Sequence, residues 1–196
     1  NGGAVFEWFA KQFGDFKRAF ELEDCLADLI ADASKVAVGS AGLIFLPYLL
    51  GERGPIWNAN AKGVYFGLNI KHEQRHFIRA TIEGIMYAVY SIGKTLEEHR
   101  SIKSLCVNGS FASFPFCTQM IADVFDKPVS IKKDSDSVAV GAFLLSATEI
   151  GIYKNLDEAA QTVQLPDTYV PKKQHHNVYL KHFAIFERLG LKLFDE

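Results

Sequence analysis

The sequence predicts an α/β fold in which helices flank a mixed sheet. Its second half alternates short apolar runs with amphipathic stretches, the order expected when helices cover a sheet. The expected elements are strands at 102–107 and 128–131 and helices at 113–125 and 137–150. We expect the two strands to be parallel neighbours, joined by the first of these helices. With 196 residues, 48% of them hydrophobic, the chain can bury a sizeable core.

The first half of the chain contributes two amphipathic helices, at 4–20 and 22–33, and two strands, at 42–47 and 63–68. The uncharged run at 36–51 falls short of the ~20 apolar residues that a membrane span requires, so we interpret it as a buried strand. The opening Asn-Gly-Gly is expected to be a bend between an earlier strand and the first helix. We therefore expect a piece of a longer protein, with no signal peptide.

A long helix is predicted at 74–99, because apolar residues recur there at alternating spacings of four and three. We interpret the resulting stripe as core rather than as a cofactor site. Its members are Ile78, Ile82, Ile85, Val89, Ile92 and Leu96. Two further helices are expected at 156–163 and 173–194, and Gly151 is expected to end the helix that precedes them.

Composition argues against several classes of partner. The 21 Lys and Arg residues and the 23 Asp and Glu residues are scattered, which predicts no broad surface for nucleic acid or for a membrane. The three cysteines, Cys25, Cys106 and Cys117, lie far apart in apolar surroundings. We expect buried thiols in a reducing compartment rather than a disulfide framework.

Histidines gather in the last predicted helix, with no Cys or carboxylate at the spacing of metal ligands. They are His175, His176 and His182. We therefore expect surface histidines and no metal site.

The segment at 105–125 is the most informative part of the chain, because an apolar run ends in Asn108-Gly109-Ser110 and continues directly into a helical pattern. A glycine at such a bend lets the backbone approach a flat or anionic group, since no Cβ intervenes. The same bend also joins ordinary strands and helices that bind nothing. The pattern alone leaves both interpretations open.

Several motifs resemble those of the FGGY carbohydrate kinases, in the same order and over essentially the whole chain. The sequence at 51–57, GERGPIW, resembles the GERxPxW loop of that family. The other matching segments are Ala61-Lys62-Gly63, Phe66-Gly67-Leu68, His72, Arg79-Ala80, Glu83-Gly84, Gln119, Ala122-Asp123, Pro128-Val129 and Gly141-Ala142. Gluconate kinases are the most similar members, with xylulose kinases next.

The resemblance implies an actin-like, ribonuclease-H-like fold and an enzyme with two lobes. Residues 1–196 would be the single C-terminal, nucleotide-binding lobe, with its first strands and the N-terminal lobe missing. The whole protein would use ATP and Mg²⁺ to phosphorylate a hydroxyl of a sugar or sugar acid in the cytoplasm. Gluconate is the first expectation, and xylulose or glycerol kinase is the enzyme alternative. The expected partners are the N-terminal lobe and the sugar, with a homodimer possible.

The resemblance also implies the nucleotide contacts, which are counted back from Gln119. They are Gly109, Ser110, Ser113 and Phe114. The family usually has a second glycine where this chain has Ser110, and Asn or Ser where it has Phe114. Phe114 can stack on adenine but cannot form a hydrogen bond with it; it can equally belong to the core.

At the other end of the chain, Gly3 and Glu7 match a glycine and a polar residue that touch the phosphates or ribose in relatives. Glu7 is acidic, which favours a ribose hydroxyl over a phosphate. No catalytic residue is expected in this chain, because the resemblance places the base in the other lobe. Asp123 lies inside a predicted helix, so we interpret it as structural.

Structural interpretations exist for the remaining motifs. Glu52, Arg53 and Trp57 are expected to pin a long loop rather than to touch a ligand, and Arg79 and Glu83 to form an i, i+4 pair. A different class of function stays open as well. A homologue without catalytic activity could use this lobe as an actin-like scaffold or binding module.

Overall fold

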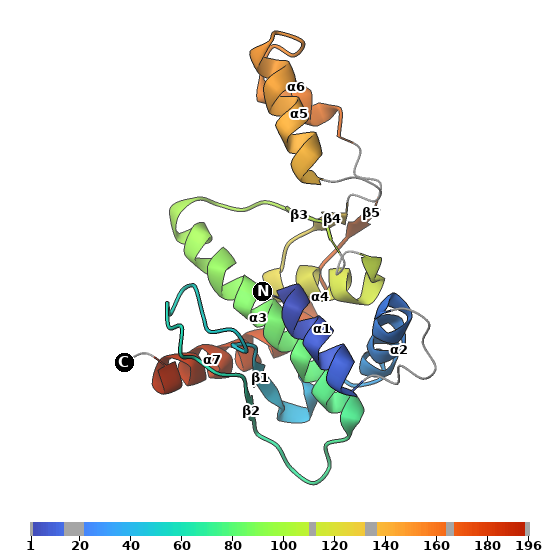
Figure 1. Cartoon of the computed structure of the whole chain (residues 1–196), viewed down its shortest axis with the longest axis vertical. Coiled ribbons are helices and arrows are strands. Elements are labelled where there is room, and N and C mark those ends of the chain that lie inside the picture. The colour runs from blue at the N-terminus through green and yellow to red at the C-terminus, as the bar shows by residue number, and fades with distance from the viewer. Residues whose placement is uncertain (1, 14–21, 110–112, 132–136, 164–166, 195–196) are drawn as a thin grey trace.

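The computed structural model describes residues 2–13, 22–109, 113–131, 137–163 and 167–194 (Figure 1). The elements in chain order are α1 (Gly2–Phe13), α2 (Leu22–Ser34), a 3₁₀ turn η1 (Ser40–Gly42), β1 (Ile44–Leu46), β2 (Val64–Phe66), α3 (Gln74–His99), β3 (Leu105–Val107), α4 (Pro115–Phe125), β4 (Val129–Ile131), α5 (Ser137–Glu149), α6 (Leu156–Gln161), β5 (Asp167–Tyr169) and α7 (Lys173–Phe194).

Most predicted elements are confirmed, and α3 and α7 have the predicted bounds. Two corrections concern the first half of the chain. Gly2 and Gly3 lie inside α1 rather than in a bend before it. Only Ile44–Leu46 of the run at 36–51 forms a strand, because a 3₁₀ turn interrupts that run. The expected continuation of the first helix beyond Phe13 lies outside the described residues.

The strands form two small sheets. β1 and β2 pair antiparallel, with Phe45 opposite Tyr65. β3 and β4 are parallel neighbours, as predicted, and β5 pairs antiparallel with β4, so the three-stranded sheet is mixed. The sequence analysis missed β5.

Helix α3 is the centre of the molecule, with α1, α2, α4, α7 and β1 packed around it (Figure 1). Gly84 permits the contact with β1, because a Cβ there would lie 2.2 Å from the carbonyl oxygen of Phe45. Ile78, Ile82 and Ile85 are buried, as expected of the core stripe.

The second half of the stripe departs from the prediction. Val89, Ile92 and Leu96 are 47%, 50% and 57% exposed. Periodicity shows that a helix has an apolar face but does not supply the partner for that face.

Helices α5 and α6 pack on each other and project from the body as an arm (Figure 1). Gly151 ends α5 with φ of +82°, and its N–H donates to Thr148 O at 3.0 Å. Its predicted role as the end of this helix is therefore confirmed.

Two sequence expectations concern cysteines and membranes. Cys25 and Cys117 are buried, and burial raises the pKa of the Cys117 thiol to about 12. Cys106 on β3 is exposed, so the prediction of three buried thiols was wrong. Among the described residues, no helix combines the length and the apolar character needed to cross a membrane.

Candidate functional site

The bend after β3 has the conformation that the sequence predicts. Gly109 is exposed and has φ of +86°, a left-handed conformation that favours glycine. A Cβ built on Gly109 would meet no atom of the described residues within 4 Å, so these residues leave the space in front of this backbone open. Ser110, the next predicted contact, lies outside the described residues. Gly109 therefore provides a backbone surface that a flat or anionic ligand could approach.

The start of α4 has little capacity to bind an anion. Its N-cap, Phe114, gives no side-chain cap, and Pro115 has no N–H. The N–H groups of Cys117 and Thr118 both donate to Phe114 O, at 3.0 and 3.1 Å. At most the N–H of Phe116 is then left in the first turn for a ligand. The bend, more than the helix N-terminus, is the part of this segment that could hold a ligand.

The side chains next to the bend differ in burial. Ser113 is exposed, whereas Phe114 is half-buried and packs against the hydrophobic core. Phe114 therefore contributes to the core, and only the part of its side chain that stays exposed could contact a planar group.

Gly3 and Glu7 lie one turn apart on the exposed side of α1. Val5 and Phe9 are 2% and 0% exposed and face the core. A Cβ on Gly3 would meet no atom of residues 2–13, 22–109, 113–131, 137–163 or 167–194 within 4 Å, so these residues leave this face open as well. Since α1 and α4 both pack on α3, one rigid helix supports both groups of predicted contacts.

A buried ion pair on α3 holds the surrounding loops. Arg79 Nε donates to Glu83 Oε1 at 2.6 Å, and the two residues are only 3% and 1% exposed. Glu83 also accepts hydrogen bonds from Gly39 N and Ser40 Oγ, at 2.9 and 3.0 Å. The predicted i, i+4 pair is confirmed.

The Arg79 guanidinium also donates to Val36 O and to Tyr179 Oη, at 3.2 and 2.7 Å. Burial lowers the pKa of Arg79, but Glu83 and Tyr179 outweigh it, and the pKa is raised. Burial raises the pKa of the Tyr179 phenol, followed in size by the effect of Glu83. With both pKa values raised, Arg79 stays charged and Tyr179 stays neutral at neutral pH. The cluster is a structural centre with no free group for a ligand.

Glu52 holds the loop that follows β1. Its carboxylate accepts hydrogen bonds from the N–H groups of Gly54, Ile56 and Trp57, at 2.8, 2.8 and 2.9 Å. The loop-pinning role of Glu52 is confirmed. The Trp57 side chain is 78% exposed, so the prediction that it pins the loop to the lobe was wrong.

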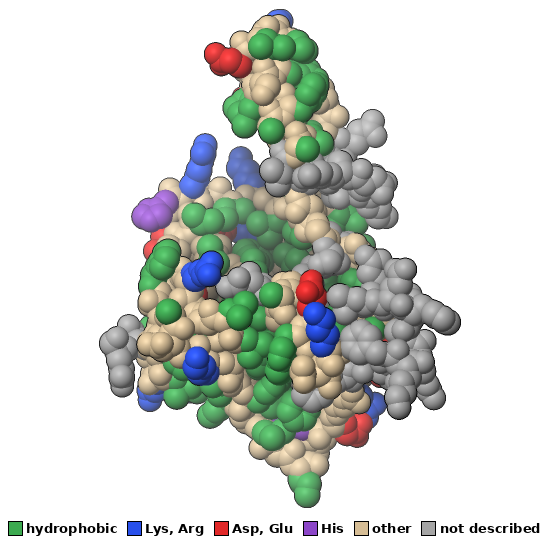
Figure 2. Space-filling view, in the orientation of Figure 1, with side chains coloured by type: hydrophobic (Ala, Val, Ile, Leu, Met, Phe, Trp, Pro, Cys, Tyr) green, Lys and Arg blue, Asp and Glu red, His purple; other side chains and the backbone are tan. Residues whose placement is uncertain are grey.

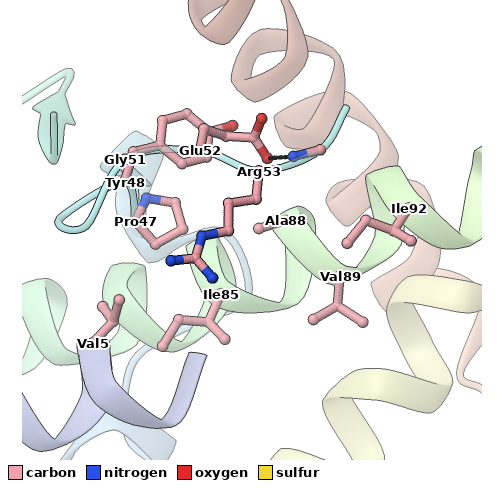
Figure 3. A pocket seen from close by; sticks show the side chains of 11 residues that line it. Val5, Pro47, Tyr48, Gly51, Glu52, Arg53, Ile85, Ala88, Val89 and Ile92 are labelled. Carbon is pink, nitrogen blue, oxygen red and sulfur yellow. Dashed lines mark hydrogen bonds between the residues drawn. The ribbon is translucent and has the colours of Figure 1, made fainter. Parts of the chain in front are cut away.

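Arg53 follows Glu52 and lines a cavity of about 350 Å³ between this loop, α1 and α3. Figure 3 shows its guanidinium extending over Ile85, beside Pro47. Among the described residues, Arg53 has no hydrogen bond or ion pair, so the structure does not show it pinning the loop either. The sequence analysis missed this cavity, because its walls come from three separate segments.

Asp123 links α4 to the start of α7. It is 2% exposed, and its Oδ1 accepts from Gln119 Nε2 and from Lys172 N, both at 2.8 Å. His175 Nδ1 donates to its Oδ2 at 2.7 Å. The interpretation of Asp123 as structural is confirmed, and Gln119 contributes to the same link.

The prediction of surface histidines was wrong. His176 is 7% exposed, and its Nδ1 donates to the backbone oxygen of Asp123 at 3.0 Å. His175 is half-buried against Asp123, and His182 is half-buried too. The partner of His175 and His176 is Asp123, which lies 52 and 53 residues away in the chain, so no local pattern could have indicated it.

Residues 1–150 match the model of the FGGY family of carbohydrate kinases, C-terminal domain. A gluconokinase of Bacillus licheniformis is 31% identical over 201 residues, which cover 100% of this chain. A xylulose kinase of Staphylococcus epidermidis is 28% identical over 178 residues, which cover 88% of it. The chain spans only 39% and 35% of the lengths of these two relatives.

A crystal structure of gluconate kinase from Lactobacillus acidophilus superposes with a TM-score of 0.88 at 31% identity. The match covers 97% of this chain and 38% of the other. The expected actin-like fold is therefore confirmed.

Proposed function

The chain belongs to the FGGY family of carbohydrate kinases, and from this membership we propose that residues 1–196 are the nucleotide-binding, C-terminal lobe of an ATP-dependent sugar kinase. The whole protein would transfer the γ-phosphate of ATP to a hydroxyl of a sugar or sugar acid in the cytoplasm. Gluconate is the first candidate, because gluconokinase has the higher identity and coverage of the two relatives compared above. Xylulose is the second candidate.

The observation that best supports the proposal is the open backbone at Gly109. Its left-handed conformation and the free space in front of it are what a closely approaching nucleotide requires. The residues that would hold ATP are Gly109, Ser110, Ser113 and Phe114, with Gly3 and Glu7 from α1. Gly3 fits a closely approaching nucleotide in the same way, since no atom in the described part of the chain occupies the space in front of it either.

Phosphoryl transfer depends on positioning and on electrostatic stabilisation, with Mg²⁺ bridging the terminal phosphates. In this chain, the bend and α1 would position the nucleotide by backbone and polar contacts. The most buried carboxylates, Glu83 and Asp123, accept hydrogen bonds that hold loops and helices in place. From the family resemblance, the catalytic base would come from the N-terminal lobe.

The proposal is tested by assaying the full-length protein with ATP, Mg²⁺ and a panel of gluconate, xylulose and glycerol. We expect the highest kcat/KM for gluconate and no turnover by the 196-residue chain alone. A higher value for xylulose or glycerol would change the assigned substrate. Turnover by the isolated chain would put the catalytic centre inside it.

The same assay distinguishes the scaffold alternative. The family usually has a glycine where this chain has Ser110, and Asn or Ser where it has Phe114. Because both positions are proposed nucleotide contacts, the scaffold alternative needs a test of its own. A folded full-length protein that neither binds ATP nor phosphorylates any sugar would favour a scaffold over a kinase.

A further inference from the structure

Asn108 lies between the end of strand β3 and the proposed nucleotide contact Gly109. Both residues are exposed, and Asn108 belongs to neither a helix nor a strand. Figure 2 shows a hollow between the arm and the body, at the level where Figure 1 places β3. Solvent therefore reaches both the side chain of Asn108 and the backbone that follows it.

The two groups of this pair that could react with each other have no hydrogen-bond partner in the described part of the chain. They are the side-chain amide of Asn108 and the backbone N–H of Gly109. Asn69 provides a contrast, because it is exposed too, but its Oδ1 accepts from Lys71 N at 2.9 Å. The Asn108 amide is thus free to turn toward the Gly109 nitrogen.

An asparagine followed by glycine can undergo an intramolecular reaction. The backbone nitrogen of Gly109 attacks the side-chain carbonyl carbon of Asn108; a C–N bond forms, the bond to the amide nitrogen breaks, and ammonia leaves with the proton that the backbone gives up. Water then opens the five-membered succinimide. Opening at one carbonyl gives aspartate, and opening at the other gives isoaspartate. No oxidant or reductant is needed.

The residue after the asparagine controls this attack, because its side chain crowds the nitrogen. Gly109 has no Cβ, and a Cβ built there would meet no atom of the described residues within 4 Å. No packing within the described structure therefore holds the pair in an unreactive conformation. The sequence has one other Asn-Gly pair, Asn1-Gly2, and Asn1 lies outside the described residues.

We infer that Asn108-Gly109 is a site of spontaneous deamidation, and that its isoaspartyl product disables the nucleotide contact at Gly109. The second half of this inference rests on the proposed function. Isoaspartate inserts one methylene carbon into the main chain directly before Gly109, so the glycine leaves the position that β3 sets for it. It also puts a negative charge beside a proposed contact of ATP, which is itself an anion. The bend would therefore lose ATP as the protein ages.

The first test follows the modification in the full-length protein and does not involve ATP. The protein is incubated in mildly alkaline buffer, which favours loss of the backbone proton, and peptide mapping by mass spectrometry measures the amide left at each asparagine. We expect Asn108 to lose its amide about tenfold faster than Asn69 or more, since glycine leaves the attacking nitrogen uncrowded. Isoaspartate should be among the products. Equal rates at Asn108 and Asn69 would overturn the inference.

The second test asks whether the product costs ATP binding. The matched control is Asn108→Gln, which keeps an exposed amide but would have to close a six-membered ring, a slower reaction. Calorimetric titration of ATP before and after incubation should show the binding-competent fraction of the wild type falling in step with isoaspartate, while Asn108→Gln keeps its full stoichiometry. An equal loss in Asn108→Gln, or conversion of Asn108 with unchanged ATP binding, would overturn the effect assigned to the product.

A further variant separates the charge from the inserted carbon. Asn108→Asp has the charge and an ordinary main chain, so we expect the fresh variant to bind ATP within about tenfold of the wild type. A complete loss of binding in fresh Asn108→Asp would contradict the role of the inserted carbon. Fresh wild type that binds no ATP would contradict the proposed function, and with it the effect of the product, while peptide mapping still decides the modification itself.

Discussion

The polar groups of two regions of the molecule differ in burial and in their hydrogen-bond partners. Around Glu83 the charges are buried and fully partnered within the chain, as the 2.6 Å bond between Arg79 and Glu83 shows. Around Gly109 the backbone is exposed, its φ is positive and no described residue fills the space in front of it. The first region has no group left for a ligand. The second has both backbone groups and room for one.

The difference teaches where function lies in this lobe. Its conspicuous charged residues, Glu52, Arg79, Glu83 and Asp123, hold loops and helices in place. The segment at 108–114, which we propose to bind the nucleotide, has no charged side chains. That division agrees with a lobe that positions a nucleotide and leaves the proton transfer to another part of the protein.

The largest expected effect on stability comes from a substitution in the buried cluster around Glu83. Glu83→Gln removes the negative charge and leaves the buried Arg79 guanidinium uncompensated, which should lower the free energy of unfolding by about 3–5 kcal/mol. The control is Lys35→Met, which breaks an exposed pair with Asp32 and should change it by less than about 1 kcal/mol. Urea denaturation measures both. Similar losses of unfolding free energy in the two variants would show that the buried pair of Arg79 and Glu83 contributes no more to stability than the exposed pair of Lys35 and Asp32.

A smaller effect tests the role of Phe114, which packs against the core and is also a proposed ATP contact. Phe114→Ala should weaken ATP binding by about 1 kcal/mol if the exposed part of the ring stacks on adenine. Phe114→Leu keeps the apolar volume for the core but lacks the aromatic face. Calorimetric titration of ATP and thermal unfolding of both variants separate the two roles. If Phe114→Leu binds ATP as tightly as the wild type, Phe114 belongs to the core alone.

The smallest effect concerns an exposed pair. A hydrogen bond from Lys173, the largest cause, lowers the pKa of Asp126 below its ordinary 3.8, so the pair stabilises the fold above that pH and stops doing so as the pH falls through the lowered pKa. Lys173→Met should raise the pKa of Asp126 and lower stability at neutral pH by less than about 1 kcal/mol. Carbon-detected NMR of the carboxyl group measures the pKa. An unchanged pKa would contradict the assigned cause.

Much of the fold could be predicted from local patterns. The long periodic helices α3 and α7 have the predicted bounds, and the parallel pair of β3 and β4 follows from the strand-helix-strand order. Strand β5 was missed because three residues, Asp-Thr-Tyr, are too few to show an alternating pattern.

The candidate site could be predicted only in part. A glycine between a strand and a helix indicates a bend, and Gly109 confirms it. The exposure of Val89, Ile92 and Leu96 could not be predicted, because it depends on which segments pack against α3. The same is true of His176, whose burial depends on a distant backbone oxygen.

The central claim is that the Gly109 bend holds ATP, and its most direct test is ATP titration by calorimetry into the full-length protein and two glycine variants. Gly109→Val puts a β-branched side chain into the open space and opposes the left-handed backbone. Gly151→Val is the matched control, because Gly151 has nearly the same φ, +82° against +86°, and equally open surroundings. We predict that Gly109→Val weakens ATP binding more than about tenfold, or 1.4 kcal/mol, while Gly151→Val and the affinity for the sugar hardly change. Unchanged ATP affinity in a folded Gly109→Val protein would contradict the claim and place the nucleotide elsewhere.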